Sequence, residues 1–253
     1  MRAVAAAVPP HQLDPAGIPP ESLDYVCDGR VLRGLVFPSG QRSGPGVLVA
    51  HEAPGLNEHV QARAQALAGL GYTALALDMY GERGFPLSET MARHEALMTS
   101  PGLIHARARA ALDVLAARPG VDASRLAAIG FCQGGITVLE LARASAPLRC
   151  VIGFHPGLTR PVGSADGPVT ARVLMMVGAE DPAIPPDHRQ LFVDEMTAKR
   201  AIWELHVFGG VGHTFTNPAV DALNRDGFRY DARADRRSWQ MALDLLEETC
   251  EPG

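Results

Sequence analysis

The chain has 253 residues, which is enough for one well-buried core and short for two. A hydrophobic fraction of 47% and a charged fraction of 20% are ordinary for a globular domain. The formal net charge of −5, without a run of Lys or Arg, argues against a nucleic-acid or membrane-surface partner.

Signals for targeting and for metal binding are weak. No apolar run approaches the roughly 20 residues that a membrane helix needs, and the apolar patch near the start is too short for a secretory signal. We therefore expect a cytoplasmic protein. The four cysteines are scattered without CxxC spacing, so we expect reduced thiols, no metal site and no cofactor.

The predicted elements begin after a proline-rich lead-in at residues 1–20, which we expect to be irregular. Residues 21–253 are expected to form one domain. Two stretches of alternating polarity, Leu23–Cys27 and Val31–Phe37, are separated by Asp28–Gly29. Asp-Gly between strand-like runs predicts a β-hairpin.

Short apolar runs then alternate with helical patterns along the chain. Strands are predicted at Val47–Ala50, Thr73–Leu77, Leu126–Phe131, Val151–Phe154, Val173–Val177 and Trp203–Phe208. Helices are predicted at Glu58–Leu70, within Ser88–Ala117, and at Gly134–Ser145, Pro186–Ala198 and Arg236–Glu248. This alternation predicts an α/β fold with a mostly parallel sheet, helices on both faces and an antiparallel hairpin at its start.

The segment that carries the chemistry is Gly130-Phe131-Cys132-Gln133-Gly134, where an apolar strand runs directly into a helix. It matches the G-x-S-x-G nucleophile elbow of α/β-hydrolases, with cysteine in place of serine. The start of the helix points free N–H groups at the sulfur, which favours the thiolate, and the N–H of Gln133 can bind an oxyanion. Taken alone, the pentapeptide fits equally well a glycine-rich turn that holds an inert, buried cysteine.

Two later residues favour the catalytic interpretation. Asp181 follows the strand Val173–Val177, and His213 follows the strand Trp203–Phe208 on a glycine-rich turn. Nucleophile, acid and histidine thus occur in the chain order of α/β-hydrolases, each at the carboxyl end of a predicted strand, where open α/β sheets assemble their sites. Singly, the aspartate fits a turn and the histidine a surface loop; together with Cys132 they predict a catalytic triad.

Other acids and histidines leave alternatives open. Glu180 is the alternative to Asp181 as the acid. His155 ends the strand Val151–Phe154, where it either lines the pocket or bonds to the backbone. The remaining histidines considered show no metal spacing and are expected at the surface or in the core: His59, His94, His105, His188 and His206.

With these residues in place, the chain resembles the dienelactone hydrolase family over nearly its whole length after the lead-in. The resemblance rests on four segments: His51-Glu-Ala-Pro-Gly-Leu-Asn57, Leu77-Asp-Met-Tyr-Gly81, Gly130-Phe-Cys-Gln-Gly-Gly135 and Gly212-His-Thr-Phe215. A cysteine elbow together with a glutamate directly after the preceding core strand is specific to this family.

The resemblance implies further roles. Glu52 is expected to contact the cysteine and to help convert thiol to thiolate when substrate arrives, although a turn or helix-capping carboxylate is the alternative. The N–H of Ala53 is expected to complete the oxyanion hole. Family members that open dienelactones grip the substrate acid with two arginines; here Arg83 is displaced by one residue from the first position, and Asn217 occupies the second.

The sequence therefore predicts a hydrolase that cleaves a small ester or lactone through an acyl-enzyme on Cys132. Candidate substrate-binding residues are Tyr80, Arg83, His155 and Asn217. Two alternatives stay open: an acyltransferase or thioesterase on the same residues, and a non-catalytic protein in which the cysteine serves binding or redox sensing. The oligomeric state is left open.

Overall fold

The computed structural model describes residues 19–250, in which one eight-stranded sheet forms the centre. The strands are β1 (Glu21–Cys27), β2 (Arg30–Phe37), β3 (Gly44–Ala50), β4 (Thr73–Ala76), β5 (Val121–Phe131), β6 (Cys150–Phe154), β7 (Arg172–Gly178) and β8 (Trp203–Phe208). The lead-in predicted to be irregular lies outside the described residues, apart from its last two.

Six α-helices and two short 3₁₀ helices are described. They are α1 (Glu58–Gly69), α2 (Thr90–Thr99), α3 (Leu103–Ala116), α4 (Gln133–Arg143), α5 (Pro186–Ala198), α6 (Ala232–Cys250), η2 (Leu87–Glu89) and η3 (Pro218–Leu223). Within residues 19–250, no helix has the length and apolarity needed to cross a membrane.

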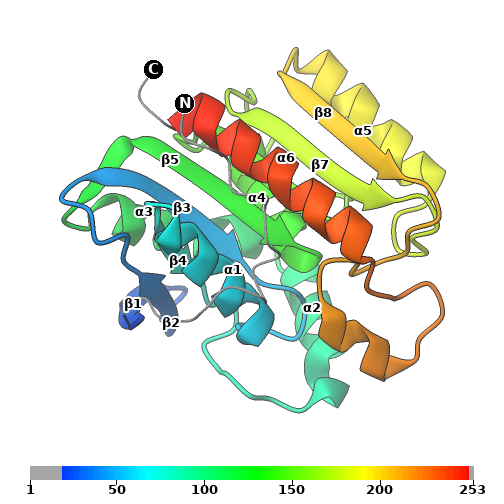
Figure 1. Ribbon diagram of the computed structural model, residues 1–253, viewed down its shortest axis with the longest axis horizontal. Coiled ribbons are helices and arrows are strands. Elements are labelled where there is room, and N and C mark those ends of the chain that lie inside the picture. The colour runs from blue at the N-terminus through cyan, green and yellow to red at the C-terminus, as the bar shows by residue number, and fades with distance from the viewer. Residues whose placement is uncertain (1–18, 251–253) are drawn as a thin grey trace.

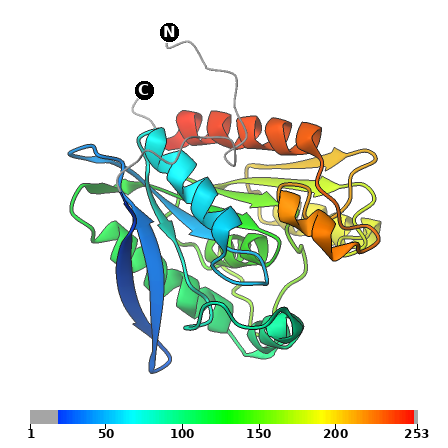
Figure 2. The same ribbon diagram turned by 60° about the horizontal axis from the view of Figure 1, so that its bottom comes forward.

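The sheet has the order β1-β2-β4-β3-β5-β6-β7-β8, and its start is antiparallel. β1 and β2 form the predicted hairpin, in which Asp28 and Gly29 have φ values of 54° and 66°. Such left-handed values are those of a type I′ turn, which explains the Asp-Gly signal. Figure 2 shows this hairpin, in blue, at one edge of the molecule. From β4 to β8 all neighbouring strands are parallel, so the predicted mixed sheet is confirmed.

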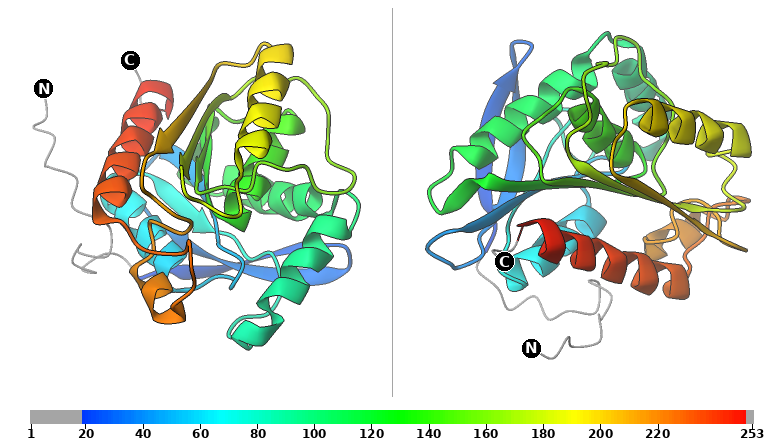
Figure 3. Two further views of the ribbon diagram at one scale, coloured as in Figure 1. Left: turned by 90° about the vertical axis from the view of Figure 1, so that its right-hand side faces the viewer. Right: turned by 90° about the horizontal axis from the view of Figure 1, so that it is seen from above.

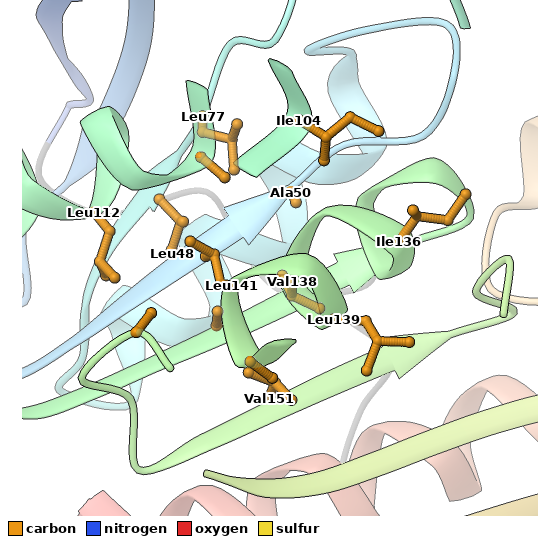
Figure 4. Close-up of a cluster of buried hydrophobic side chains, with 14 of the residues drawn as sticks. Leu48, Ala50, Leu77, Ile104, Leu112, Ile136, Val138, Leu139, Leu141 and Val151 are labelled. Atoms are coloured by element: carbon orange, nitrogen blue, oxygen red, sulfur yellow. The ribbon is translucent and has the colours of Figure 1, made fainter. Parts of the chain in front are cut away.

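Helices cover both faces of the sheet, with α1 and α6 on one face and α3, α4 and α5 on the other (Figure 3). Successive residues of a strand point to opposite faces. Accordingly, Val47 and Val49 of β3 pack in the cluster beneath α1 and α6, whereas Leu48 and Ala50 pack in the cluster beneath the other helices. Figure 4 shows the second cluster, where residues of α4 such as Val138 lie against the sheet.

The parallel pairing brings the carboxyl ends of β3, β5, β6, β7 and β8 to one end of the sheet. In Figure 1 the arrowheads of β5, β7 and β8 point to the same side of the molecule, toward the orange segment that contains η3. The loops that follow these strands are therefore neighbours, although they are far apart in the sequence.

Two helical regions differ in detail from the predictions. The stretch 88–117 is divided into α2 and α3 at Pro101 and Gly102, because proline lacks an N–H and Gly102 has a left-handed φ of 68°. η3 was not predicted; it begins after Asn217, whose side chain accepts the N–H of Ala219 at 3.1 Å.

Candidate active site

Cys132 lies in the sharp turn between β5 and α4, with φ of 51° and ψ of −113°. A positive φ is uncommon for a residue other than glycine, so this backbone is strained. The flanking glycines allow the close approach that the turn requires. A Cβ atom on Gly130 would lie 2.0 Å from the carbonyl oxygen of Gly134, and one on Gly134 would lie 2.2 Å from that of Ala50.

The structure brings the three residues of the predicted triad together. Nε2 of His213 lies 3.2 Å from Sγ of Cys132, and its Nδ1 lies 2.6 Å from Oδ2 of Asp181. The second carboxylate oxygen of Asp181 accepts the N–H of Ala183 at 2.8 Å. Both Asp181 and His213 are buried. This arrangement can move a proton between sulfur and imidazole while the aspartate orients the ring.

The charge balance of the triad favours a protonated His213. Burial alone lowers the pKa of this histidine, but a thiolate at Cys132, together with the hydrogen bonds that the ring makes to Asp181 and Cys132, raises it to about 10. A backbone hydrogen bond and a ring contact also fix the position of the imidazole. The N–H of His213 donates to the carbonyl of Gly227 at 2.7 Å, and the ring of Phe228 packs against the imidazole at 4.9 Å between centroids.

The two residues predicted to form the oxyanion hole are Gln133 at the start of α4 and Ala53 in the loop after β3. Tyr80 ties the two segments together, because its hydroxyl lies 3.0 Å from the carbonyl of Ala53 and 2.8 Å from Oε1 of Gln133. His94 of α2 also contacts Oε1 of Gln133, at 2.9 Å. The predicted oxyanion-hole residues are thus held by Tyr80 and His94.

Glu52 is buried beside this site, and its contacts are to Asn217 and His59. The side-chain amide of Asn217 donates to Oε2 of Glu52 at 2.7 Å, and Nδ1 of His59 lies 3.4 Å from the same oxygen. Oε1 of Glu52 is buried without a hydrogen-bond partner. Burial raises the pKa of Glu52, but His59, with smaller contributions from His155 and Asn217, outweighs this effect and lowers the pKa to about 2.

His155 is fully buried behind the triad. Its Nε2 lies 2.8 Å from Oγ1 of Thr216, and its ring packs against those of His213 and Phe215 at 5.3 Å and 5.2 Å. Burial lowers the pKa of His155 well below the usual value, so the ring is neutral. The side chain of His155 thus bonds to another side chain and not to the backbone, as one of its two predicted roles required.

Other predicted residues point elsewhere. Arg83 is exposed and donates to the carbonyl of Arg33. Glu180, the alternative acid, is also exposed, and it pairs with Arg229 at 3.3 Å. The side-chain amide of Asn217 donates to Glu52. Neither of the two positions that the family resemblance assigns to substrate arginines therefore presents a charge at the triad.

Sequence reasoning missed the site contacts of two histidines, His59 and His94, because it tested histidines only for metal spacing. His59 stands in the first turn of α1, which starts directly after the loop that holds Glu52. The sequence did contain a signal for His59. A helix that starts directly after the loop following a strand places its first residues near the carboxyl end of that strand. No comparable signal exists for His94, because α2 reaches Gln133 only through the tertiary fold.

Residues 32–250 match the family model described as the Dienelactone hydrolase family, which spans the strands and loops that build this site. The chain belongs to the dienelactone hydrolase family. The predicted α/β-hydrolase fold is confirmed with it.

Similar proteins support a hydrolase. A carboxymethylenebutenolidase of a Pseudomonas species is 30% identical over 231 residues, covering 87% of this chain and 92% of the relative. A Bradyrhizobium protein named a probable 2-oxo-3-(5-oxofuran-2-ylidene)propanoate lactonase is 29% identical, covering 80% of this chain and 83% of the relative. Among solved structures, a dienelactone hydrolase-like promiscuous phosphotriesterase from metagenomic libraries superimposes with a TM-score of 0.87 at 36% identity, covering 92% of this chain and 98% of the other.

Proposed function

We propose that this dienelactone hydrolase family member cleaves a carboxylic ester or lactone of a small molecule through a thioester on Cys132. The observation that carries the proposal is the contact from Sγ of Cys132 to His213 and on to Asp181, at a strained turn that opens a helix. The names of the relatives, a butenolidase and a lactonase, favour a lactone as substrate.

In the first step, the thiolate of Cys132 attacks the acyl carbon, so that an S–C bond forms and the carbonyl oxygen becomes an oxyanion. The N–H groups of Gln133 and Ala53 donate to this oxyanion. The C–O bond to the leaving group then breaks, and His213 gives its proton to the departing alkoxide. In a lactone the alcohol stays attached to the acyl group.

In the second step, His213 takes a proton from water, and the resulting hydroxide attacks the thioester carbon. The S–C bond breaks, the acid is released and the thiolate returns. Glu52 is proposed to assist by accepting the thiol proton when substrate excludes water from the site; the proton then passes to His213, so that Glu52 returns to its carboxylate form and the imidazolium can protonate the leaving alkoxide. The chemistry needs thiols in reduced form, which fits a cytoplasmic location, and none of the four cysteines forms a disulfide within residues 19–250.

The test is a panel of small lactones and aryl esters, with mass spectrometry of the intact protein to find an acyl adduct. A neutral aryl phosphotriester belongs in the panel because of the name of the structural neighbour. We expect an adduct on Cys132 and turnover that is lost in Cys132→Ala. Full activity in Cys132→Ala, or labelling at another residue, contradicts the proposal.

Two further variants separate the alternatives. His213→Ala is expected to lose about 10³-fold or more in rate, whereas a non-catalytic protein would show no rate to lose. Adding an alcohol or thiol acceptor tests acyl transfer: hydrolysis predicts free acid as the main product, and an acyltransferase predicts the new ester or thioester.

A further inference from the structure

Two cysteines lie together at the end of the sheet that is opposite to the triad. Cys150 is the first residue of β6 and Cys250 is the last residue of α6, and both are completely buried. Cys132, Asp181 and His213 follow the carboxyl ends of their strands, whereas Cys150 stands at the amino end of a parallel strand. The proposed reaction therefore uses neither of these two thiols.

The side chains of Cys150 and Cys250 are in contact, although the two residues are far apart in the sequence. The hydroxyl oxygen of Thr249 lies 3.3 Å from Sγ of Cys150 and 3.6 Å from Sγ of Cys250. The two thiols also share a hydrogen bond, and this bond, together with burial, raises the pKa of Cys150 well above its ordinary value. Cys150 is therefore an uncharged thiol at neutral pH, as its apolar surroundings require.

The elements that carry the two thiols hold them in this contact. Cys150 pairs with Ala127 of β5 and with Arg172 of β7 in the interior of the sheet. Cys250 closes α6, and both cysteines belong to the apolar cluster beneath α1 and α6. Cysteines whose side chains point apart cannot be bridged unless the backbone moves. These two side chains point toward each other, so a disulfide can form while α6 keeps its place on the sheet.

We propose that Cys150 and Cys250 are a modification site, at which a small-molecule disulfide such as glutathione disulfide produces a cross-link that holds α6 to the sheet. Cys250 reacts first, because it stands in the last turn of a helix, and helix ends open more readily than a central strand does. Cys150 then completes the cross-link from within the sheet.

The modification consists of two thiol–disulfide exchanges. In the first, Cys250 loses its proton and its sulfur attacks the oxidant, so that a mixed disulfide forms and one glutathione leaves as a thiolate that takes up the proton. In the second, Cys150 loses its proton and its sulfur attacks the sulfur of Cys250, so that the mixed S–S bond breaks and the second glutathione leaves in the same way. Two cysteines are oxidised, and one glutathione disulfide is reduced to two thiols.

The cross-link closes a loop of about 100 residues, which includes β7, β8 and the loops that carry Asp181 and His213. Closing a long loop restricts the unfolded chain and thereby stabilises the folded one. We expect the oxidised protein to unfold at a temperature at least about 5 °C higher than the reduced protein does.

The test is to incubate the reduced protein with glutathione disulfide and to map its peptides by mass spectrometry without reduction. We expect a cross-linked pair of peptides that contains Cys150 and Cys250, together with the rise in unfolding temperature, and dithiothreitol should reverse both. Absence of this cross-link, or a cross-link between another pair of cysteines in its place, overturns the proposal. A cross-link that leaves the unfolding temperature unchanged overturns its role in holding α6.

Cys150→Ala and Cys27→Ala are the matched variants, since each removes one cysteine and Cys27 ends β1 at the edge of the sheet. Each variant is compared with itself before and after oxidation, so that a change in packing at the substituted position cancels. Cys150→Ala should show no rise in unfolding temperature, and Cys27→Ala should show the wild-type rise. A rise in Cys150→Ala, or none in Cys27→Ala, contradicts the proposal. If Cys150→Ala does not fold, Cys250→Ala takes its place. The same cross-link is expected in Cys132→Ala, so a failure of the proposed activity is recognised separately.

Discussion

The contact between Cys132 and His213 couples the charges of the two side chains. With Cys132 as a thiolate, the pKa of His213 is raised to about 10, so the imidazole then keeps its proton at neutral pH and loses it only as the pH rises through that value. Burial would lower this pKa if it acted alone. The proton is therefore retained by the charges of Cys132 and Asp181.

It follows that Cys132→Ala should lower the pKa of His213 by at least about one unit, because the negative partner at 3.2 Å is removed while burial remains. Asp181→Asn should also lower it. The measurement is an NMR titration of the His213 ring, assigned by its absence in His213→Ala. A ring that titrates at the same pH in wild type and Cys132→Ala would show that the sulfur carries no charge.

Individual residues also determine whether the site can bind a charged substrate. A carboxylate in a buried site needs a fixed cation, and arginine binds both of its oxygens. Here Arg83 bonds to the carbonyl of Arg33, and Asn217 is held by Glu52. We predict that neutral lactones or esters are turned over at least as well as their carboxylate-bearing analogues, and that Arg83→Ala changes kcat/KM by less than about threefold.

A matched pair of substrates checks this prediction, the free acid against its methyl ester, in wild type and in Arg83→Ala. A strong preference for the acid that disappears in Arg83→Ala would show that one arginine is enough. Such a result would mean that the loop carrying Arg83 moves toward the triad when substrate binds.

Residue types and their order were sufficient to predict the proximity of Cys132, Asp181 and His213, because each follows a strand of one parallel sheet. The partners of Glu52 were beyond that reasoning. Its contacts with His59 and Asn217 join residues 7 and 165 positions away in the chain, and only the packing of α1 against the loop after β8 brings them together.

At the scale of the element, the turn from β5 into α4 depends on glycine. A Cβ on Gly134 would meet backbone atoms, the carbonyl oxygens of Ala50 and His51 at 2.2 Å and 2.9 Å. We predict that Gly134→Ala destabilises the protein by about 3 kcal/mol and abolishes activity, because α4 must move away from β3. Thermal unfolding and ester turnover are the measurements.

Gly69→Ala provides the comparison. Gly69 closes α1, and a Cβ there meets nothing within 4 Å. Alanine is the better helix former, so this variant should be neutral or more stable by up to about 1 kcal/mol. Equal losses in the two variants would mean that the clash at the elbow is not the cause.

The elements themselves were predictable where a local signal marks them. Asp28-Gly29 located the hairpin, and apolar runs located the core strands, because a strand buried on both faces has no polar positions. The first and last residues of the elements were less predictable. β5 begins at Val121, before its apolar part, because its first residues pair with Gly44 and Pro45 rather than pack in the core.

At the scale of the whole molecule, the first and the last α-helix of the described chain are joined on one face of the sheet. α1 follows β3 near the start, and α6 ends the described residues; both cover the same face (Figure 3). Arg63 of α1 bonds to Asp235 of α6 and to the carbonyl of Thr216, three residues after His213. Trp239 and Phe131 lie beside its guanidinium, at 5.1 Å and 5.6 Å. One buried cation thus connects α1, α6 and the loop that carries His213.

Asp235→Asn should therefore be strongly destabilising, by about 3–5 kcal/mol, because it leaves the guanidinium of Arg63 buried without its partner. The double variant Arg63→Met/Asp235→Leu removes both charges and should lose less stability than the single variant does, since apolar groups of similar size suit that site.

Urea unfolding of wild type, the single variant and the double variant gives the comparison. Asp24→Asn is the control, because Asp24 pairs with Arg33 at 2.6 Å on the surface, where water screens the charges. That control should change stability little. A single variant as stable as wild type would mean that α6 is not held through this pair, and a double variant less stable than the single would mean that the ion pair stabilises the fold beyond the cost of burying it.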